Sequence, residues 1–232
     1  VIIENNTNKT KSTYSILHFL DEEKSYHLYF LDQISALNEC LKIETTKKEL
    51  ESHILSIIEL WRNIKIPAEH KIRGLWGELL IINSSNNKNE LLKSWHSKYN
   101  DKYDFYDHNE AIEVKTTISN ERIHHFSYEQ INNPKEKLII ASILIQENIN
   151  GKSLNDLKKE IENNIDEPDL KNKLTNNFHQ AIGATKNIEK FKYDYQYSIR
   201  NILYYNQSEL PKFNNIPSEI KNIEFDLNLS RI

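Results

Sequence analysis

The chain has 232 residues, a net charge of −4 at pH 7 and one cysteine, Cys40. This length can bury one sizeable core, and the charge excludes the strongly basic composition that favours non-specific nucleic-acid binding. The single cysteine excludes an intramolecular disulfide framework and a cysteine-based zinc site. No apolar run approaches the ~20 residues that cross a bilayer and no signal peptide is visible, so we expect a cytoplasmic protein without a membrane partner.

The first part of the chain predicts mostly helix. Residues 12–30 mix apolar and charged side chains and predict two short strands around a polar turn at 21–24. Apolar residues at intervals of three and four then predict helices over 48–64 and 69–83, separated by Pro67. We expect one domain over residues 1–232, in which about residues 1–66 form an N-terminal elaboration before the core.

The middle of the chain predicts strands. An Asn- and Ser-rich loop over 83–89 precedes a short helix through Trp95. Residues 103–106 and 111–118 are strand-like and flank a turn composition at 107–109, which predicts a hairpin. The continuous apolar run over 137–146 predicts a central strand covered on both faces.

The last part of the chain returns to helices and then to strands. Ser153 and Asp156 predict the capped start of a helix, and residues 169–182 predict another helix that ends at Gly183. Aromatic and β-branched residues over 191–205 and 223–232 favour strands. This order of elements predicts an α/β (α+β) domain with helices flanking a sheet.

The strand over 111–118 carries a possible reactive group. Alternation places Glu113 and Lys115 on one strand face, about 7 Å apart, while Val114 points to the other face. One register of the predicted hairpin brings Asp104 beside Glu113. Two adjacent carboxylates repel each other unless a cation lies between them, and Mg²⁺ uses oxygen ligands of this kind. A metal-held water and the Lys115 ammonium would then suffice for phosphodiester hydrolysis.

A less specific interpretation competes with this one. A Glu-x-Lys pair on a strand is commonly the solvated face of an amphipathic hairpin. Glu78 adds a third carboxylate, on the flank of the apolar stripe of the helix over 69–83. Gly74 and Gly77 lie on the same helix although each costs about 1 kcal/mol relative to alanine, which indicates close approach by another element or a ligand. A surface Glu on a tightly packed helix explains these residues equally well.

Several segments together resemble a known group. "GLWGELLI", "YDF", "IEVKTT" and "IHHFSYEQI" resemble the PD-(D/E)XK nuclease superfamily, and specifically an uncharacterised prokaryotic family of PD-(D/E)XK motif proteins. "IIELWRNI", "LIIASILI", "GKSLNDL" and "IEFDLNLSRI" extend the resemblance from about residue 16 to the C-terminus. One departure is that no proline precedes Asp104.

The resemblance implies a restriction-endonuclease-like core, a central mixed β-sheet flanked by helices. Asp104 and Glu113 would be metal ligands, Glu78 an additional or water-mediated ligand, and Lys115 the residue that positions the attacking water. The implied cofactor is Mg²⁺, with Mn²⁺ as a substitute, and the implied substrate is DNA. Further candidates for DNA contact are Arg122, His124 and Gln130, although a structural role is the more common one for a histidine beside a second histidine.

The expected function is a Mg²⁺-dependent DNA endonuclease of a prokaryotic restriction or anti-phage defence system. It would act as a homodimer or with other subunits of that system, and it could be active only inside a larger complex. The alternative is a non-catalytic subunit with the same fold that binds nucleic acid or a partner protein. The modest acidity of the chain favours reliance on a partner for DNA affinity.

Overall fold

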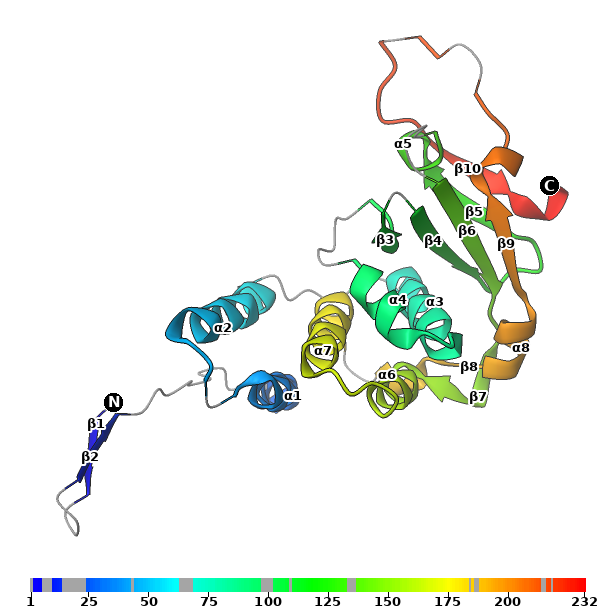
Figure 1. Cartoon of the computed structure of the whole chain (residues 1–232). Helices are drawn as coiled ribbons and strands as arrows, with labels where there is room; N and C mark the ends of the chain where they lie inside the picture. Colours follow the sequence, from blue (N-terminus) through cyan, green and yellow to red (C-terminus); the bar gives the residue numbers. More distant parts are fainter. Residues whose placement is uncertain are drawn as a thin grey trace.

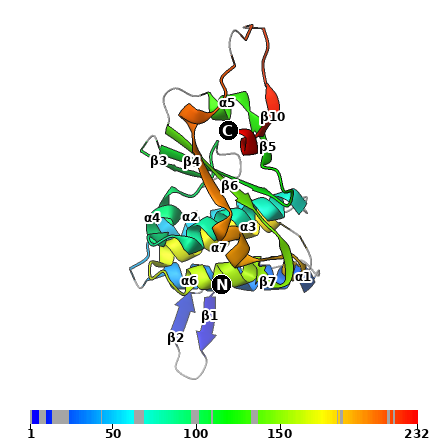
Figure 2. The same ribbon diagram turned by 90° about the vertical axis from the view of Figure 1, so that its right-hand side faces the viewer.

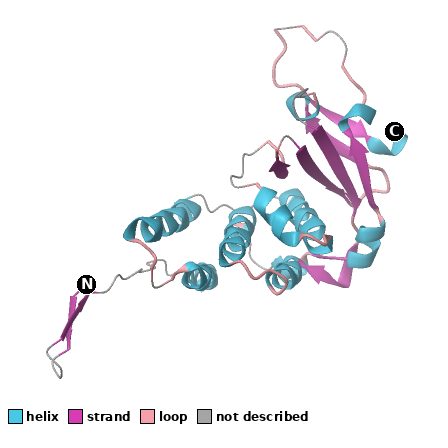
Figure 3. Ribbon diagram, in the orientation of Figure 1, coloured by secondary structure: helices cyan, strands magenta, loops and turns pink. Residues whose placement is uncertain are grey.

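A computed structural model describes residues 2–5, 10–13, 24–42, 44–62, 69–96, 102–108, 110–132, 137–183, 185, 188–213, 216–217 and 219–232. Within these ranges the chain combines a mixed sheet with helices packed beside it (Figures 1 and 3). The mixed α/β architecture predicted above is therefore confirmed. No helix in the described residues is both long enough and apolar enough to cross a membrane.

The central sheet has four strands in the order β3-β4-β6-β9. Strands β4 and β6 are parallel, and the outer strands pair antiparallel to them, so the sheet is mixed. The predicted hairpin and central strand are both confirmed. The strands are β3 (Phe105–Asp107), β4 (Glu110–Thr117), β6 (Lys137–Leu144) and β9 (Ile202–Asn206).

Three two-stranded sheets complete the strand structure, and each is antiparallel. The pair β5 and β10 covers one face of the central sheet, whereas the hairpin of β1 and β2 lies away from the central sheet (Figures 1 and 2). The strands are β1 (Ile2–Asn5), β2 (Thr10–Thr13), β5 (Ile123–Ser127), β7 (Glu147–Ser153), β8 (Lys192–Tyr193) and β10 (Glu224–Asn228).

Helices cover the other face of the central sheet, with α3 directly on it and α6 and α7 behind α3 (Figure 2). Helix α1 packs against α7. The helices are α1 (Lys24–Cys40), α2 (Lys47–Arg62), α3 (Glu69–Ser84), α4 (Lys88–Ser94), α5 (Tyr128–Ile131), α6 (Leu154–Glu162), α7 (Pro168–Ile182) and α8 (Tyr195–Arg200), with short 3-10 turns η1 (Ile188–Lys190), η2 (Gln207–Glu209) and η3 (Leu229–Arg231).

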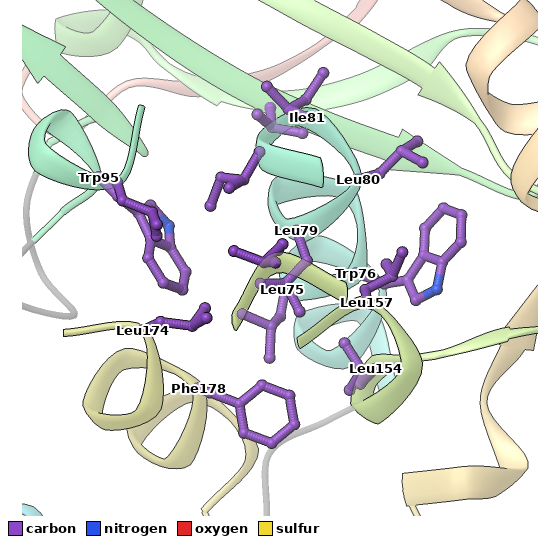
Figure 4. Close-up of a cluster of buried hydrophobic side chains, with 14 of the residues drawn as sticks. Leu75, Trp76, Leu79, Leu80, Ile81, Trp95, Leu154, Leu157, Leu174 and Phe178 are labelled. Carbon is purple, nitrogen blue, oxygen red and sulfur yellow. The ribbon is translucent and has the colours of Figure 1, made fainter. Parts of the chain in front are cut away.

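The larger core lies between the sheet and the helices. Side chains of α3 point toward Leu174 and Phe178 of α7, with Trp95 beside them (Figure 4). On the sheet side, Val114, Ala141 and Ile143 complete this cluster. A smaller core on the opposite sheet face contains Ala111, Leu138, Ile140, Phe126, Ile131 and Leu229. Burial on both faces explains the continuous apolar run of β6.

Helix α3 lies unusually close to β4 at Gly77. A Cβ placed on Gly77 would overlap Cγ2 of Thr116 and lie 3.2 Å from Cγ1 of Val114. The close approach predicted for this glycine is therefore confirmed. Gly74 differs, because a Cβ there would meet no described atom within 4 Å. Close packing against β4 therefore explains the glycine at position 77, but the described contacts of α3 give no such reason at position 74.

Several local predictions are confirmed. Helices α2, α3 and α4 match the predicted segments, although residues 63, 64 and 67 lie outside the described residues. Ser153 forms a capping box with Asp156 at the start of α6, and α7 ends at Gly183, which has a φ of 50°. These two helix-terminal signals depend on neighbouring residues alone, which explains why the sequence predicted them.

Two strand predictions are wrong. Residues 24–30 begin helix α1, whose buried side chains Ala36, Leu37 and Cys40 lie further along the chain, while Leu28 and Leu31 stay exposed and blur the helical stripe. Residues 14–23 of the same prediction lie outside the described residues. Residues 195–200 form helix α8 because the Asp194 carboxylate accepts the Tyr197 N–H at 2.9 Å and caps a helical turn.

Candidate active site

The four predicted catalytic residues line one pocket of about 510 Å³. The pocket lies where α3 and the segment after α4 meet the edge of the central sheet beside β3 and β4. Asp104, Glu113 and Lys115 come from the hairpin, and Glu78 comes from α3. Separate segments of the chain therefore bring the Lys115 ammonium and three carboxylates together, and Lys71 also lines the pocket.

Asp104 lies immediately before β3 and faces the next strand. Phe105 pairs with Ile112, so the same register places Asp104 opposite Glu113, as predicted. Oδ2 of Asp104 accepts the backbone N–H of Val114 at 2.7 Å. Burial and the negative charges of Glu113 and Glu78 raise the pKa of the Asp104 carboxyl well above its usual value. Ionisation of the Asp104 carboxyl beside Glu113 and Glu78 is therefore unfavourable.

Glu113 is buried, and its Oε1 accepts hydrogen bonds from two side chains. Nζ of Lys115 lies 2.9 Å away and Nε2 of Gln130 lies 3.1 Å away. Burial raises the pKa of Glu113, and the positive charge of Lys115 offsets part of that increase. The Lys115 ammonium also lies 5.0 Å from the ring centre of Phe126, a cation-π contact. Its charge thus has two partners, the Glu113 carboxylate and the Phe126 ring.

The face that carries Glu113 and Lys115 is not the solvated surface of a hairpin. Strand β5 and helix α5 cover it, and the side chain of Glu113 is only 8% exposed. The competing interpretation from the sequence is therefore wrong for these two residues, because a second layer packs on that sheet face. Burial of a carboxylate costs free energy even beside a lysine, and ionisable groups shifted in this way are frequent at functional sites.

Glu78 is held at the opposite side of the pocket by two aromatic residues. Nε1 of Trp95 donates to Oε2 of Glu78 at 2.6 Å, and Nε2 of His96 lies 3.1 Å from the same oxygen. The side chain of Glu78 is 13% exposed. The flank position predicted for Glu78 on α3 therefore does bring it to the edge of the sheet.

These oxygen donors suit a hard divalent cation. Mg²⁺ is commonly bound through one or two carboxylates together with waters and substrate phosphate, and Asp104 and Glu113 provide two such carboxylates. As they stand, the described residues contain no group of three or more His, Cys, Asp or Glu side chains that could hold a metal ion. Oε2 of Glu78 is already engaged by Trp95 and His96, so Asp104 and Glu113 are the two carboxylates that could hold such an ion.

Two of the three candidates for DNA contact, Arg122 and His124, are buried, whereas Gln130 is half-buried. The Arg122 guanidinium is buried and donates to the carbonyls of Ser142 and Asn201 at 2.6 and 2.8 Å. Nε2 of His124 lies 2.7 Å from Oγ of Ser142. Arg122 therefore joins β6 to the chain before β9, a structural role. His124 lines the pocket, and burial together with the charges of Lys115 and Arg122 lowers its pKa to about 4.

Gln130 acts on the candidate site directly. Its amide donates to Glu113, while its Oε1 accepts the Ser127 N–H at 3.1 Å and closes a capping box at α5. Sequence reasoning treated Gln130 as a contact to DNA, and its placement instead makes it a support for Glu113. The local signal for this role is the cap, because a residue fixed at the third position of a helix points back toward its start.

Sequence reasoning missed Trp95 and His96. Trp95 was assigned only to the end of a short helix, and His96 attracted no attention. Their signal is weak in the sequence, because nothing in the spacing of α3 and α4 shows that both rings turn toward Glu78.

Comparison with known proteins gives one match. A family model described as "Putative PD-(D/E)XK family member, (DUF4420)" matches residues 2–230. No curated protein and no solved structure matches the chain. The match spans the pocket residues and nearly the entire chain, and it agrees with the mixed sheet flanked by helices.

Proposed function

We propose that this chain is a Mg²⁺-dependent endonuclease that hydrolyses phosphodiester bonds of DNA. The chain belongs to the PD-(D/E)XK family whose model matches residues 2–230. The observation that carries the proposal is the convergence of Asp104, Glu113, Glu78 and Lys115 on one pocket. The raised pKa values of Asp104 and Glu113 support it, since burial and neighbouring carboxylates disfavour their negative charges and a bound cation would favour them.

In this proposal Asp104 and Glu113 hold the metal ion. Mg²⁺ would polarise the scissile phosphate and lower the pKa of a bound water. The Lys115 ammonium, 2.9 Å from Glu113, would stabilise the negative charge that develops on the phosphate oxygens. Gln130 keeps the Glu113 carboxylate in place through the α5 cap. Neutral His124 adds no positive charge beside Lys115 at physiological pH.

The affinity for DNA needs a further contribution. The chain carries a net charge of −4, whereas contacts to phosphates supply most of the affinity of DNA-binding proteins. We therefore propose that a second copy or another subunit contributes to DNA binding. A place in a restriction or anti-phage system, in the cytoplasm, is the wider proposal, and the resemblance described above supports it.

The test is plasmid cleavage by the purified protein with Mg²⁺, with Mn²⁺ and with EDTA. Lys115→Met and Asp104→Asn should each reduce the rate about 100-fold or more, as removal of a group that stabilises developing charge does. Matched controls are Lys137→Met and Asp107→Asn, which remove exposed charges outside the pocket. Cleavage that is equal in all five proteins would refute the assignment of the site.

The non-catalytic alternative is favoured by one observation, the absence of a group of three metal-binding side chains in the described ranges. A binding assay separates the two functions. If the protein binds a labelled duplex with equal affinity in Ca²⁺ and in EDTA, and does not cleave the duplex with Mg²⁺ or Mn²⁺, the chain is a binding subunit. Binding that strengthens with Ca²⁺ and cleavage that begins with Mg²⁺ support the nuclease.

A further inference from the structure

Two consecutive residues, Trp95 and His96, connect the separate parts of the pocket. Trp95 ends α4, where its N–H donates to the Leu91 carbonyl at 2.8 Å, and it forms an isolated antiparallel bridge with Phe105. The dipeptide therefore lies between the helical layer and the start of β3. Its indole ring is 1% exposed and packs within the larger core (Figure 4).

Both side chains donate to one oxygen of Glu78. An ionised carboxylate only accepts hydrogen bonds, so the Trp95 indole at 2.6 Å and the His96 Nε2 at 3.1 Å are both donors to Oε2. Among the hydrogen bonds of the described residues, none engages Oε1. The donors stabilise the negative charge of Glu78 beside two other carboxylates, and they leave one oxygen for a cation or its water.

The other ring nitrogen of His96, Nδ1, takes no part in the contact with Glu78. Nδ1 is buried and has no hydrogen-bond partner within the described part of the chain. The hydrogen donated to the Glu78 carboxylate is carried by Nε2, so the contact does not depend on Nδ1. The useful atom of His96 is therefore Nε2, and a side chain that keeps a donor at that position can replace the ring.

The backbone of the dipeptide holds the opposite side of the pocket. The His96 N–H donates to the carbonyl of Asp104 at 2.8 Å, and the His96 carbonyl accepts from Nδ2 of Asn177 at 2.6 Å. Asn177 is buried on α7. His96 thus contacts Glu78 through its ring, Asp104 through its backbone N–H and the helical layer through its backbone carbonyl.

We infer that Trp95 and His96 are positioning residues that set the Glu78 carboxylate and the Asp104 backbone relative to each other, so that Glu78 offers Oε1 alone to the metal-bound water. This inference rests on the proposed function. It predicts that losing either ring donor weakens metal binding even without DNA, by about tenfold or more, as loss of a hydrogen bond to a metal-site carboxylate does.

The test compares His96→Gln with His96→Asn. The Gln side chain can place its amide nitrogen near the position of Nε2, whereas Asn reaches only the position of Nδ1. Titration of each protein with Mn²⁺ by calorimetry, without DNA, should show that His96→Asn weakens binding at least tenfold while His96→Gln stays within about threefold of the unmodified chain. Thermal unfolding without metal should be similar for the two variants, since both remove the same ring.

Trp95→Phe provides a second measurement, because it removes the N–H and keeps an aromatic ring in the core. In a Glu78→Ala background, the difference between His96→Asn and His96→Gln should disappear, since the accepting oxygen is gone. Equal Mn²⁺ affinity for the Asn and Gln variants would overturn the inference and leave the proposed function standing. If the unmodified chain binds no Mn²⁺ and cleaves no DNA, the inference and the proposed function both fail.

Discussion

Alanine at Gly77 and alanine at Gly74 should have opposite effects on stability, although both replace a glycine within α3. Each substitution gains about 1 kcal/mol of helix propensity. At Gly77 the new Cβ overlaps Cγ2 of Thr116 and lies 3.2 Å from Cγ1 of Val114, inside the core. Overpacking of this kind costs about 1 to 3 kcal/mol, and the upper value applies because both neighbours are stiff β-branched residues on a central strand.

The expected net result is a loss of about 2 kcal/mol for Gly77→Ala and a gain of about 1 kcal/mol for Gly74→Ala. Gly74 gains because its Cβ would meet no described atom within 4 Å. Urea denaturation followed by tryptophan fluorescence and circular dichroism measures both free energies of unfolding without metal. Two variants of equal stability would refute the close packing of α3 on β4.

The same pair of variants should also separate stability from activity. Gly74 lines the pocket, so a methyl group there narrows the space beside Glu78 while the fold becomes more stable. Gly77→Ala instead pushes α3 away from β4 and moves Glu78 from Glu113 and Lys115. We therefore expect a lower rate of DNA cleavage in both variants. The melting temperature should rise only in Gly74→Ala.

Three further predictions concern charge and burial. Asp104→Asn should raise the free energy of unfolding at pH 7 without metal, because it removes a carboxyl group whose ionisation is disfavoured by burial and by the charges of Glu113 and Glu78. Mg²⁺ should stabilise the unmodified chain but not this variant. Arg122→Met should lower the free energy of unfolding by about 2 to 3 kcal/mol, since buried acceptors lose a charged donor, with no change in metal affinity measured by calorimetry. The hydrogen bond from His179 lowers the pKa of Asp32 from 3.8 to about 2. The stability that Asp32 contributes is therefore present above pH 4 and is lost as the pH falls toward 2. Urea titrations from pH 2 to 6 should show that the difference in unfolding free energy between the unmodified chain and Asp32→Asn shrinks as the pH falls.

Regular periodicity made the elements around the site predictable. The stripe of α3, the alternation of β4 and the apolar run of β6 each depend on residues close in the chain, and all three are confirmed. Alternation also put Glu113 and Lys115 on one strand face. Their burial was not predictable, because the covering layer comes from β5 and α5 and from β10, which follows much later.

The same reasoning explains the error in the N-terminal segment. Helix α1 buries a face against α7, so its amphipathic pattern depends on a partner more than a hundred residues away in the chain. Trp95 and His96 are a further case. An indole at the end of a helix is ordinary core composition, and its bond to Glu78 depends on how α4 packs beside α3.

The shortness of β3 is what opens the site. The ladder with β4 begins at Phe105, so the chain leaves the sheet at Asp104, one residue earlier, where the register is opposite Glu113. A longer β3 would satisfy the Val114 N–H with a backbone carbonyl, but here the Asp104 carboxylate accepts it. A charged side chain therefore replaces a ladder hydrogen bond at the sheet edge. The Val114 N–H thereby keeps a hydrogen-bond acceptor. The Asp104 carboxylate also lies beside Glu113 and Lys115, so the pocket forms at the end of β3.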